Sequence, residues 1–290
     1  MLESKMKNIC IILVLLSATV GLSGCFGTDD IQPGLEQRFI QETSIIDEYL
    51  QDNNLDAQVD NYSTLRFEEL LEGNGLAPYT ANSVNLTYKT MLLATGDTVE
   101  VAENVTIDWD ELVVGLQVGL RNVRESGRMI LYVPSVLAYG EQGQGDIPPN
   151  AILIYDITLN SFDLPQLKNE VSFIQSYVKD SIVATRHPSG IYYRINEPGT
   201  GLRPTWGSGV FVDYEGKFIE NEERFDGRMG ANFNLSSVIQ GWQIGLQEIG
   251  EGGNIDLFIP STFGYGEEGR GSIPPNASLR FNIDLISVSN

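Results

Sequence analysis

Histidine, cysteine and positive charge are scarce in this chain of 290 residues. One histidine, His187, and two cysteines, Cys10 and Cys25, are too few for a histidine–cysteine zinc site, a Cys–His dyad or a disulfide framework in the folded body. His187 precedes a proline in a turn-like segment, which disfavours a Ser-His-Asp triad. Lysine and arginine total 18 against 39 aspartates and glutamates, a net charge of −21. Because phosphate binding requires clustered cations, this balance argues against a nucleic-acid partner.

The remaining composition is that of a folded, glycine-rich protein. Hydrophobic residues make up 42% of the chain and charged residues 20%, which is typical of globular domains. The 30 glycines predict many tight turns and a body rich in β-structure. The length predicts about two domains.

Residues 1–25 have the pattern of an export signal. Two lysines precede an apolar stretch, Ile9 to Val20, which is too short for a comfortable membrane span. The stretch ends in Leu22-Ser23-Gly24-Cys25, which resembles the lipobox of bacterial lipoproteins. The resemblance implies cleavage before Cys25 and a lipid anchor on that residue. An uncleaved anchor, or a simple signal with an incidental cysteine, is the alternative.

The residue after Cys25 bears on localisation. An aspartate at this position would resemble an inner-membrane retention signal, but the residue here is Phe26. We therefore expect a lipid-anchored protein of the bacterial cell envelope, with the outer membrane or a periplasm-facing position favoured. Residues 26–32 are expected to form a flexible tether.

The rest of the chain is an internal repeat. Several motifs recur after the same separation of 126 positions, so that two copies of one domain follow each other in tandem. The recurring pairs are Tyr139-Gly140-Glu141 with Tyr265-Gly266-Glu267, Ile147-Pro148-Pro149-Asn150-Ala151 with Ile273-Pro274-Pro275-Asn276-Ala277, and Tyr88 with Tyr214.

Hydrophobic periodicity predicts an α+β fold for each copy. Apolar residues at helical spacing precede each copy, within 35–50 and 167–178. Alternating segments such as 210–214, 254–259 and 278–286 predict strands, and Val238 to Ile249 predicts one short helix. We expect an antiparallel sheet wrapped on that helix. The preceding helical segments are expected to be packing struts or spacers, the alternative being a dimerisation or partner surface.

These patterns predict five segments. They are the signal at 1–25, a tether and helix at 26–60, the first domain at 61–162, a helical linker at 163–189 and the second domain at 190–290.

The repeated motifs resemble the FKBP-type peptidyl-prolyl cis-trans isomerase family, twice over. In the second copy the resemblance rests on several ordered motifs, which are Val212-Asp213-Tyr214-Glu215-Gly216, Arg224-Phe225-Asp226-Gly227, Val238-Ile239-Gln240-Gly241-Trp242, Ile259-Pro260 leading to Phe263-Gly264-Tyr265-Gly266, Ile273-Pro274-Pro275-Asn276-Ala277 and Leu279-Arg280-Phe281. The resemblance implies two tandem FKBP-like domains.

The resemblance also implies a proline pocket in the second copy. Trp242 would form its floor, Tyr265 would hydrogen-bond a bound carbonyl, and Asp226 would accept from Tyr214 or a nearby donor and hold the walls. Ile273 would cover the ligand and contribute its backbone amide. The walls would be Tyr214, Phe225, Val238, Ile239 and Phe281, with Phe233 on the strand before the helix.

The implied activity is rotation about Xaa-Pro bonds in unfolded or newly exported polypeptides. No bond breaks, so no nucleophile, metal or cofactor is needed, and an apolar pocket suffices to favour the twisted imide. Trp242, Phe281 or the Pro274-Pro275 pair alone would be ordinary core or turn residues, and only their joint order supports this reading. The alternatives are a non-catalytic peptide-binding chaperone and an envelope scaffold that uses the same fold.

The first copy departs from the pattern at its floor and one wall. Leu116 replaces Trp242, and Val99-Glu100 replaces Phe225-Asp226. This degenerate pocket would comprise Tyr88, Val99, Leu116, Tyr139, Ile147 and Tyr155. We expect reduced activity, a degenerate peptide-binding module or a spacer that lifts the second domain off the membrane.

Overall fold

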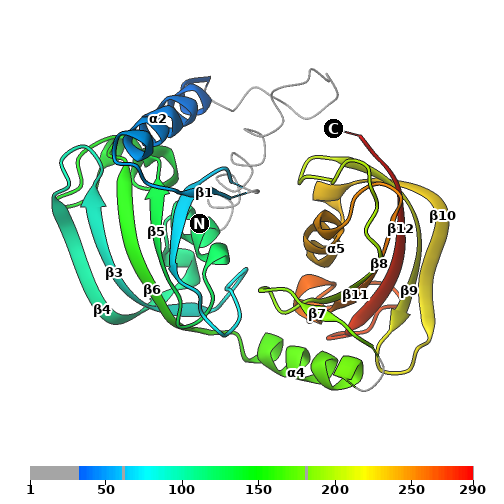
Figure 1. Cartoon of the computed structure of the whole chain (residues 1–290). Helices are drawn as coiled ribbons and strands as arrows, with labels where there is room; N and C mark the ends of the chain where they lie inside the picture. The colour runs from blue at the N-terminus through cyan, green and yellow to red at the C-terminus, as the bar shows by residue number, and fades with distance from the viewer. Residues whose placement is uncertain (1–32, 61–62, 180–181, 290) are drawn as a thin grey trace. The chain divides into compact units, whose positions relative to one another are not determined.

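The computed structural model describes residues 33–60, 63–179 and 182–289. The export signal at 1–25, the lipidation residue Cys25 and the tether at 26–32 lie outside the described residues. The chain divides into two compact units, with the boundary between Asp163 and Leu164 (Figure 1). Across the described ranges, no helix is both long and apolar enough to span a membrane.

The first unit is a six-stranded antiparallel sheet in the order β1-β2-β5-β6-β3-β4. In chain order, one helix precedes the sheet and one short helix lies between β4 and β5. The elements are α2 (Pro33–Asp52), β1 (Gln58–Val59), β2 (Arg66–Leu71), β3 (Ser83–Leu92), β4 (Thr98–Asp108), α3 (Val114–Gly119), β5 (Arg128–Val133) and β6 (Leu153–Asp163), with 3-10 turns η2 (Trp109–Glu111), η3 (Leu120–Asn122), η4 (Ser135–Leu137) and η5 (Gly140–Gln142).

The second unit repeats this order as β7-β8-β11-β12-β9-β10, again antiparallel. Its elements are α4 (Pro165–Lys179), β7 (Thr185–Arg186), β8 (Tyr192–Glu197), β9 (Gly209–Phe218), β10 (Arg224–Asn234), α5 (Gln240–Gly245), β11 (Gly253–Ile259) and β12 (Leu279–Ser289), with 3-10 turns η6 (Leu235–Ser237), η7 (Leu246–Glu248) and η8 (Ser261–Phe263). The sheet curves around α5 (Figure 1). The predicted α+β fold with two tandem antiparallel domains is confirmed.

The short helix packs closely on the sheet because it carries two glycines one turn apart. A Cβ on Gly241 would lie 2.5 Å from the Ile259 side chain, and a Cβ on Gly245 would lie 2.4 Å from Leu257. Gly115 and Gly119 of α3 make the same close approach to β5. The predicted helix over 238–249 is too long: α5 ends at Gly245, and the 3-10 turn η7 follows.

The longer helices are parts of the units rather than linkers. Ile46 and Leu50 of α2 form a buried cluster with Leu93, Tyr132 and Ile154 of the first unit. Leu167, Val171, Ile174 and Val178 of α4 are also buried, and the Tyr177 ring lies 5.9 Å from Phe258. These contacts agree with the expectation that the two helices are packing struts. The predicted segments 26–60 and 163–189, however, place each helix outside the domain on whose sheet it packs.

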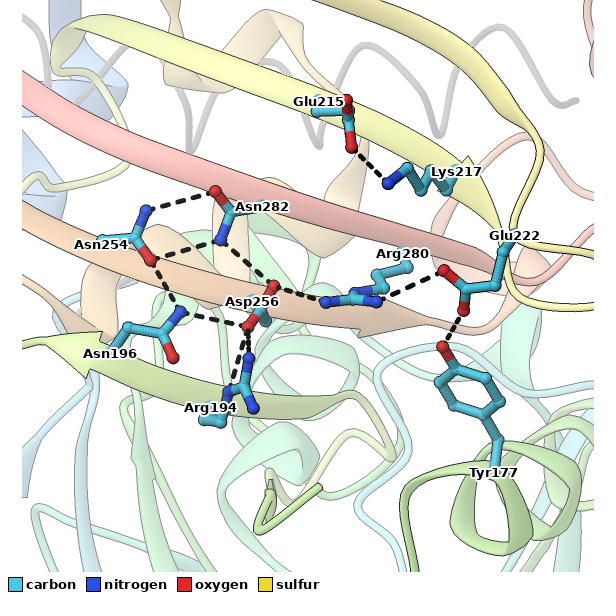
Figure 2. A network of polar contacts seen from close by, with 10 residues as sticks. All are labelled: Tyr177, Arg194, Asn196, Glu215, Lys217, Glu222, Asn254, Asp256, Arg280 and Asn282. Atoms are coloured by element: carbon cyan, nitrogen blue, oxygen red, sulfur yellow. Dashed lines mark hydrogen bonds and ion pairs between the residues drawn. The ribbon is translucent and has the colours of Figure 1, made fainter. Parts of the chain in front are cut away.

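Beyond the end of α4, the outer face of the second sheet carries a polar network (Figure 2). Its centre is Asp256 of β11, whose side chain is 1% exposed. Asp256 accepts hydrogen bonds from Arg194 at 2.5 Å, from Asn282 at 3.2 Å and from Arg280 at 3.4 Å. Burial opposes ionisation of Asp256, but these bonds, one from Asn196 and the charge of Arg280 outweigh it and lower its pKa. The network therefore ties β8, β11 and β12 together.

Candidate active site

Aromatic side chains from four elements meet inside the second unit. The Trp242 ring of α5 lies 5.1 Å from Tyr214 of β9, 5.2 Å from Phe281 of β12 and 5.7 Å from Phe233 of β10, measured between ring centroids. All three pairs are edge-to-face, a favoured geometry for aromatic rings. The helix and the curved sheet thus fix the indole from three sides.

These rings surround a cavity of about 390 Å³. Trp242 is 4% exposed, and its indole N–H is buried without a hydrogen-bond partner in the described residues. The lining residues are Tyr214, Asp226, Phe233, Ser237, Val238, Ile239, Trp242, Gly264, Tyr265, Arg270 and Phe281. Eight of the ten residues expected at the pocket therefore line one cavity, with an aromatic floor and a few polar groups.

The polar groups differ in how firmly they are held. The Tyr214 hydroxyl donates to Asp226 at 2.9 Å, as expected, and the Gly227 amide donates to the same carboxylate at 2.8 Å. Burial, followed by the bond to Asp226, raises the pKa of Tyr214 to about 12. The Tyr265 hydroxyl has no hydrogen-bond partner in the described residues, and burial raises its pKa as well. Tyr265 is thus a cavity phenol with a free donor.

Two expected residues lie outside the cavity lining. Phe225 packs behind the wall, with its ring 5.6 Å from Phe281 and 4.8 Å from Phe218. A register shift in the pairing of β10 with β9, between Arg224 and Asp226, interrupts the simple alternation of faces there. Ile273 is buried, but its amide donates to the Arg270 carbonyl at 2.9 Å. Contrary to expectation, that amide is engaged within its own loop.

A second free donor lies at the start of α5. Ile239 lines the cavity, and its amide donates to no acceptor within the described ranges. This follows from its position, because the first amides of a helix have no partner inside the helix.

Comparison with known proteins identifies the family. The family model described as FKBP-type peptidyl-prolyl cis-trans isomerase matches residues 77–160 and 201–286, more than half of the chain. The chain belongs to this family. Each unit is therefore an FKBP domain, and the resemblance inferred from the sequence motifs is confirmed.

Several curated relatives share the FKBP sequence over part of their length. The chain is 35% identical over 187 residues to rat "Peptidyl-prolyl cis-trans isomerase FKBP9", covering 64% of this chain and 30% of that protein. It is 37% identical over 126 residues to "Probable FKBP-type peptidyl-prolyl cis-trans isomerase FkpA" of Neisseria meningitidis, covering 42% and 45%. A solved peptidyl-prolyl cis-trans isomerase from Pseudomonas syringae is 35% identical with a TM-score of 0.40, covering 43% of this chain and 95% of that one. The chain spans less than half the length of the curated relatives it matches.

The first FKBP domain keeps the tyrosine–carboxylate pair but not the aromatic floor. The Tyr88 hydroxyl donates to Glu100 at 2.7 Å, the counterpart of the bond between Tyr214 and Asp226. Burial, followed by that bond, raises the pKa of Tyr88. Leu116 is buried in place of Trp242, and Tyr155, which replaces Phe281, is 2% exposed. Burial and the neighbouring Tyr139 raise the pKa of Tyr155.

The cavity of the second FKBP domain also includes residues that the sequence interpretation missed. Ser237, Gly264 and Arg270 line it. The signal was their position: Ser237 and Gly264 directly adjoin predicted pocket residues, and Arg270 lies in the loop between Tyr265 and Ile273. Across the described residues, no group of three or more His, Cys, Asp or Glu side chains could hold a metal ion.

Proposed function

We propose that the second FKBP domain catalyses cis-trans isomerisation of Xaa-Pro bonds in exported polypeptides. The observation that carries this proposal is the cavity of about 390 Å³ with the Trp242 indole against its aromatic walls. Its size and aromatic walls suit a proline side chain and the residue before it.

The chemistry follows from the resonance of the imide bond. Rotation passes a barrier of about 18–20 kcal/mol, because twisting the bond removes its partial double-bond character. Water around the carbonyl stabilises the planar, dipolar form. A cavity lined by Trp242, Phe281 and Phe233 replaces that water with aromatic surface and so favours the twisted, less dipolar state.

The polar groups of the cavity would orient the substrate. The free hydroxyl of Tyr265 and the free amide of Ile239 are the donors we assign to substrate carbonyls. Asp226 is occupied by Tyr214 and the Gly227 amide, so we assign it to holding the wall rather than to proton transfer. The Ile273 amide takes no part, because it donates to the Arg270 carbonyl.

Exchanging the floor residue tests the proposal in the full chain. Trp242→Leu gives the second domain the residue found in the first, and we expect kcat/KM for proline peptides to fall about 100-fold, or about 2.7 kcal/mol of transition-state stabilisation. Leu116→Ala is the matched control and should leave kcat/KM unchanged. A wild-type chain that binds proline peptides without isomerising them would favour the chaperone alternative and reject catalysis.

We also propose that the chain is a lipoprotein of the bacterial cell envelope, on the basis of the Leu22-Ser23-Gly24-Cys25 motif. Cys25→Ser removes the thiol to which lipid would attach. The variant should move from the membrane fraction to the soluble fraction or remain uncleaved, as measured by fractionation and intact-mass analysis. A mass difference no larger than that of the Cys-to-Ser exchange itself, with unchanged membrane association, would reject lipidation.

A further inference from the structure

The loop that carries Tyr265 and Ile273 is a single hydrogen-bonded segment. The Ser261 carbonyl accepts from the amides of Gly264 at 2.8 Å and Gly266 at 2.9 Å. The Gly266 carbonyl in turn accepts from the Asn276 amide at 2.9 Å. Gly266, the residue after Tyr265, is therefore hydrogen-bonded both to Ser261 of η8 and to Asn276, and so links the two ends of the loop.

Helix α4 contacts both ends of this loop. Glu170 accepts from the Ser261 hydroxyl and, at 3.4 Å, from the Thr262 amide. The Gln166 amide donates to the Asn276 side chain at 2.6 Å and to the Ser261 hydroxyl at 3.2 Å. It also donates to Glu170 at 3.2 Å, so the two helix residues act together. Five residues, Gln166 and Glu170 of the helix with Ser261, Thr262 and Asn276 of the loop, therefore form one polar junction.

The first domain has the same junction. Glu42 of α2 accepts from the amide and from the hydroxyl of Ser135, both at 2.6 Å, and Ser135 stands 126 positions before Ser261. Arg38 donates to the Asn150 side chain at 2.5 Å, at the position equivalent to Asn276. Two different residues, Arg38 and Gln166, thus reach the same loop asparagine. An arginine in one domain and a glutamine in the other thus bind equivalent loop residues, which indicates that contact with this loop is the feature that both helices share.

We propose that Glu170 and Gln166 are positioning residues for the active-site loop of the second domain. This inference rests on the proposed function, because it assigns a role to Tyr265 in substrate binding. The Tyr265 hydroxyl has no partner of its own in the described residues, so its location depends on the backbone that carries it. The helix holds that segment through the side chains of Ser261 and Asn276 and through the backbone amide of Thr262.

The other end of α4 supplies a control. The Tyr177 hydroxyl donates to Glu222, which also contacts Arg280 at 3.4 Å, next to Asp256 (Figure 2). This contact holds the helix on the outer face of the sheet, away from the loop residues. Tyr177→Phe therefore weakens the attachment of α4 without touching Ser261 or Asn276.

The test compares five variants of the full chain. Because a misplacement of about 1 Å can cost about 100-fold, we expect the partial loosening in Glu170→Ala to lower kcat/KM about tenfold. Glu170→Gln keeps one acceptor oxygen and should recover most of this loss. Tyr177→Phe and the first-domain Glu42→Ala should match the wild type. Gln166→Ala, at a half-buried position, provides a milder variant should Glu170→Ala fail to fold.

Hydrogen exchange gives a readout independent of catalysis. The amides of Gly266 and Asn276 should exchange faster in Glu170→Ala than in Tyr177→Phe. Wild-type exchange and activity in Glu170→Ala would overturn the inference, as would an equal loss in Tyr177→Phe, which would indicate general loosening of the helix. If the wild type lacks isomerase activity, the proposed function fails. The exchange rates and the affinity for a proline peptide, followed by Trp242 fluorescence, then decide the positioning role.

Discussion

The two FKBP domains share one framework and differ in what fills it. Six aromatic positions of the second domain correspond to only two aromatic residues in the first. The pairs are Phe218 and Leu92, Phe225 and Val99, Phe233 and Ile107, Trp242 and Leu116, Tyr214 and Tyr88, and Phe281 and Tyr155. Strand order, the paired helix glycines, the tyrosine–carboxylate bond and the loop junction recur in both domains. The framework is thus separable from the chemistry of the pocket.

The outer faces of the two sheets differ as much as the pockets. Ile130 and Ile154 of the first domain stand where Asp256 and Arg280 stand in the second. The first pair packs under α2, which has 20 residues, whereas α4 has 15 and leaves that region to the polar network. The equivalent region of the outer sheet face is therefore packed by an apolar helix face in the first domain and filled by a buried carboxylate with two arginines in the second.

Removing the buried carboxylate should have the largest effect on stability. Asp256→Ala leaves Arg194 and Arg280 without their shared partner, and we expect the second domain to lose about 3 kcal/mol. Asp156→Ala is the control on the outer face of the first domain. Its ion pair with Arg128 is more exposed and should contribute only about 0.5 kcal/mol. Urea unfolding monitored by hydrogen exchange of β11 and β5 separates the two domains. Equal losses would mean that the network adds nothing beyond an ordinary surface pair.

Introducing the indole into the first domain should have the next largest effect. Leu116→Trp replaces a buried leucine with a larger indole in a domain where the equivalent of Phe281, Tyr155, is also buried, and we expect overpacking to cost about 2 kcal/mol without conferring isomerase activity. Activity is measured in a Trp242→Leu background, where the second domain contributes little. A gain of activity from this single change would show that the two pockets differ in function by the floor residue alone.

Acid should weaken the second domain more than its Asp256→Ala variant. The folded protein lowers the pKa of Asp256 below its ordinary value of 3.8. The unfolded chain then binds more protons, so this stabilisation is complete above about pH 4 and is lost as the pH falls through the folded pKa. The loss should be smaller than that caused by Asp256→Ala, because a protonated side chain still accepts hydrogen bonds. Parallel stability curves of wild type and variant between pH 5 and pH 2 would contradict this assignment.

The sequence predicted the framework better than the contacts. Motifs separated by 126 positions located both domains and most residues of the cavity, because each motif lies on one strand or loop. The loop junction was hidden, since Glu42 and Glu170 are 128 positions apart while Ser135 and Ser261 are 126 apart. The network around Asp256 depends on the pairing of β8, β11 and β12. The position of Phe225 outside the cavity lining depends on an irregular register in β10. Such contacts between strands have no local signature.

The smallest expected effect concerns the feature that both pockets share. Tyr214→Phe removes the hydroxyl that donates to Asp226 but keeps the ring beside Trp242, and the Gly227 amide still holds the carboxylate. We expect kcat/KM to fall about fivefold, equivalent to about 1 kcal/mol, with no change for Tyr88→Phe in the first domain. The folded pKa of Tyr214 is raised to about 12, so its contribution to stability should be complete below about pH 10 and lost as the pH rises through 12. The Tyr214→Phe variant should lack that alkaline loss, which difference absorbance and unfolding at each pH would measure. A fivefold fall in activity from Tyr88→Phe instead would assign catalysis to the first domain and reverse the comparison.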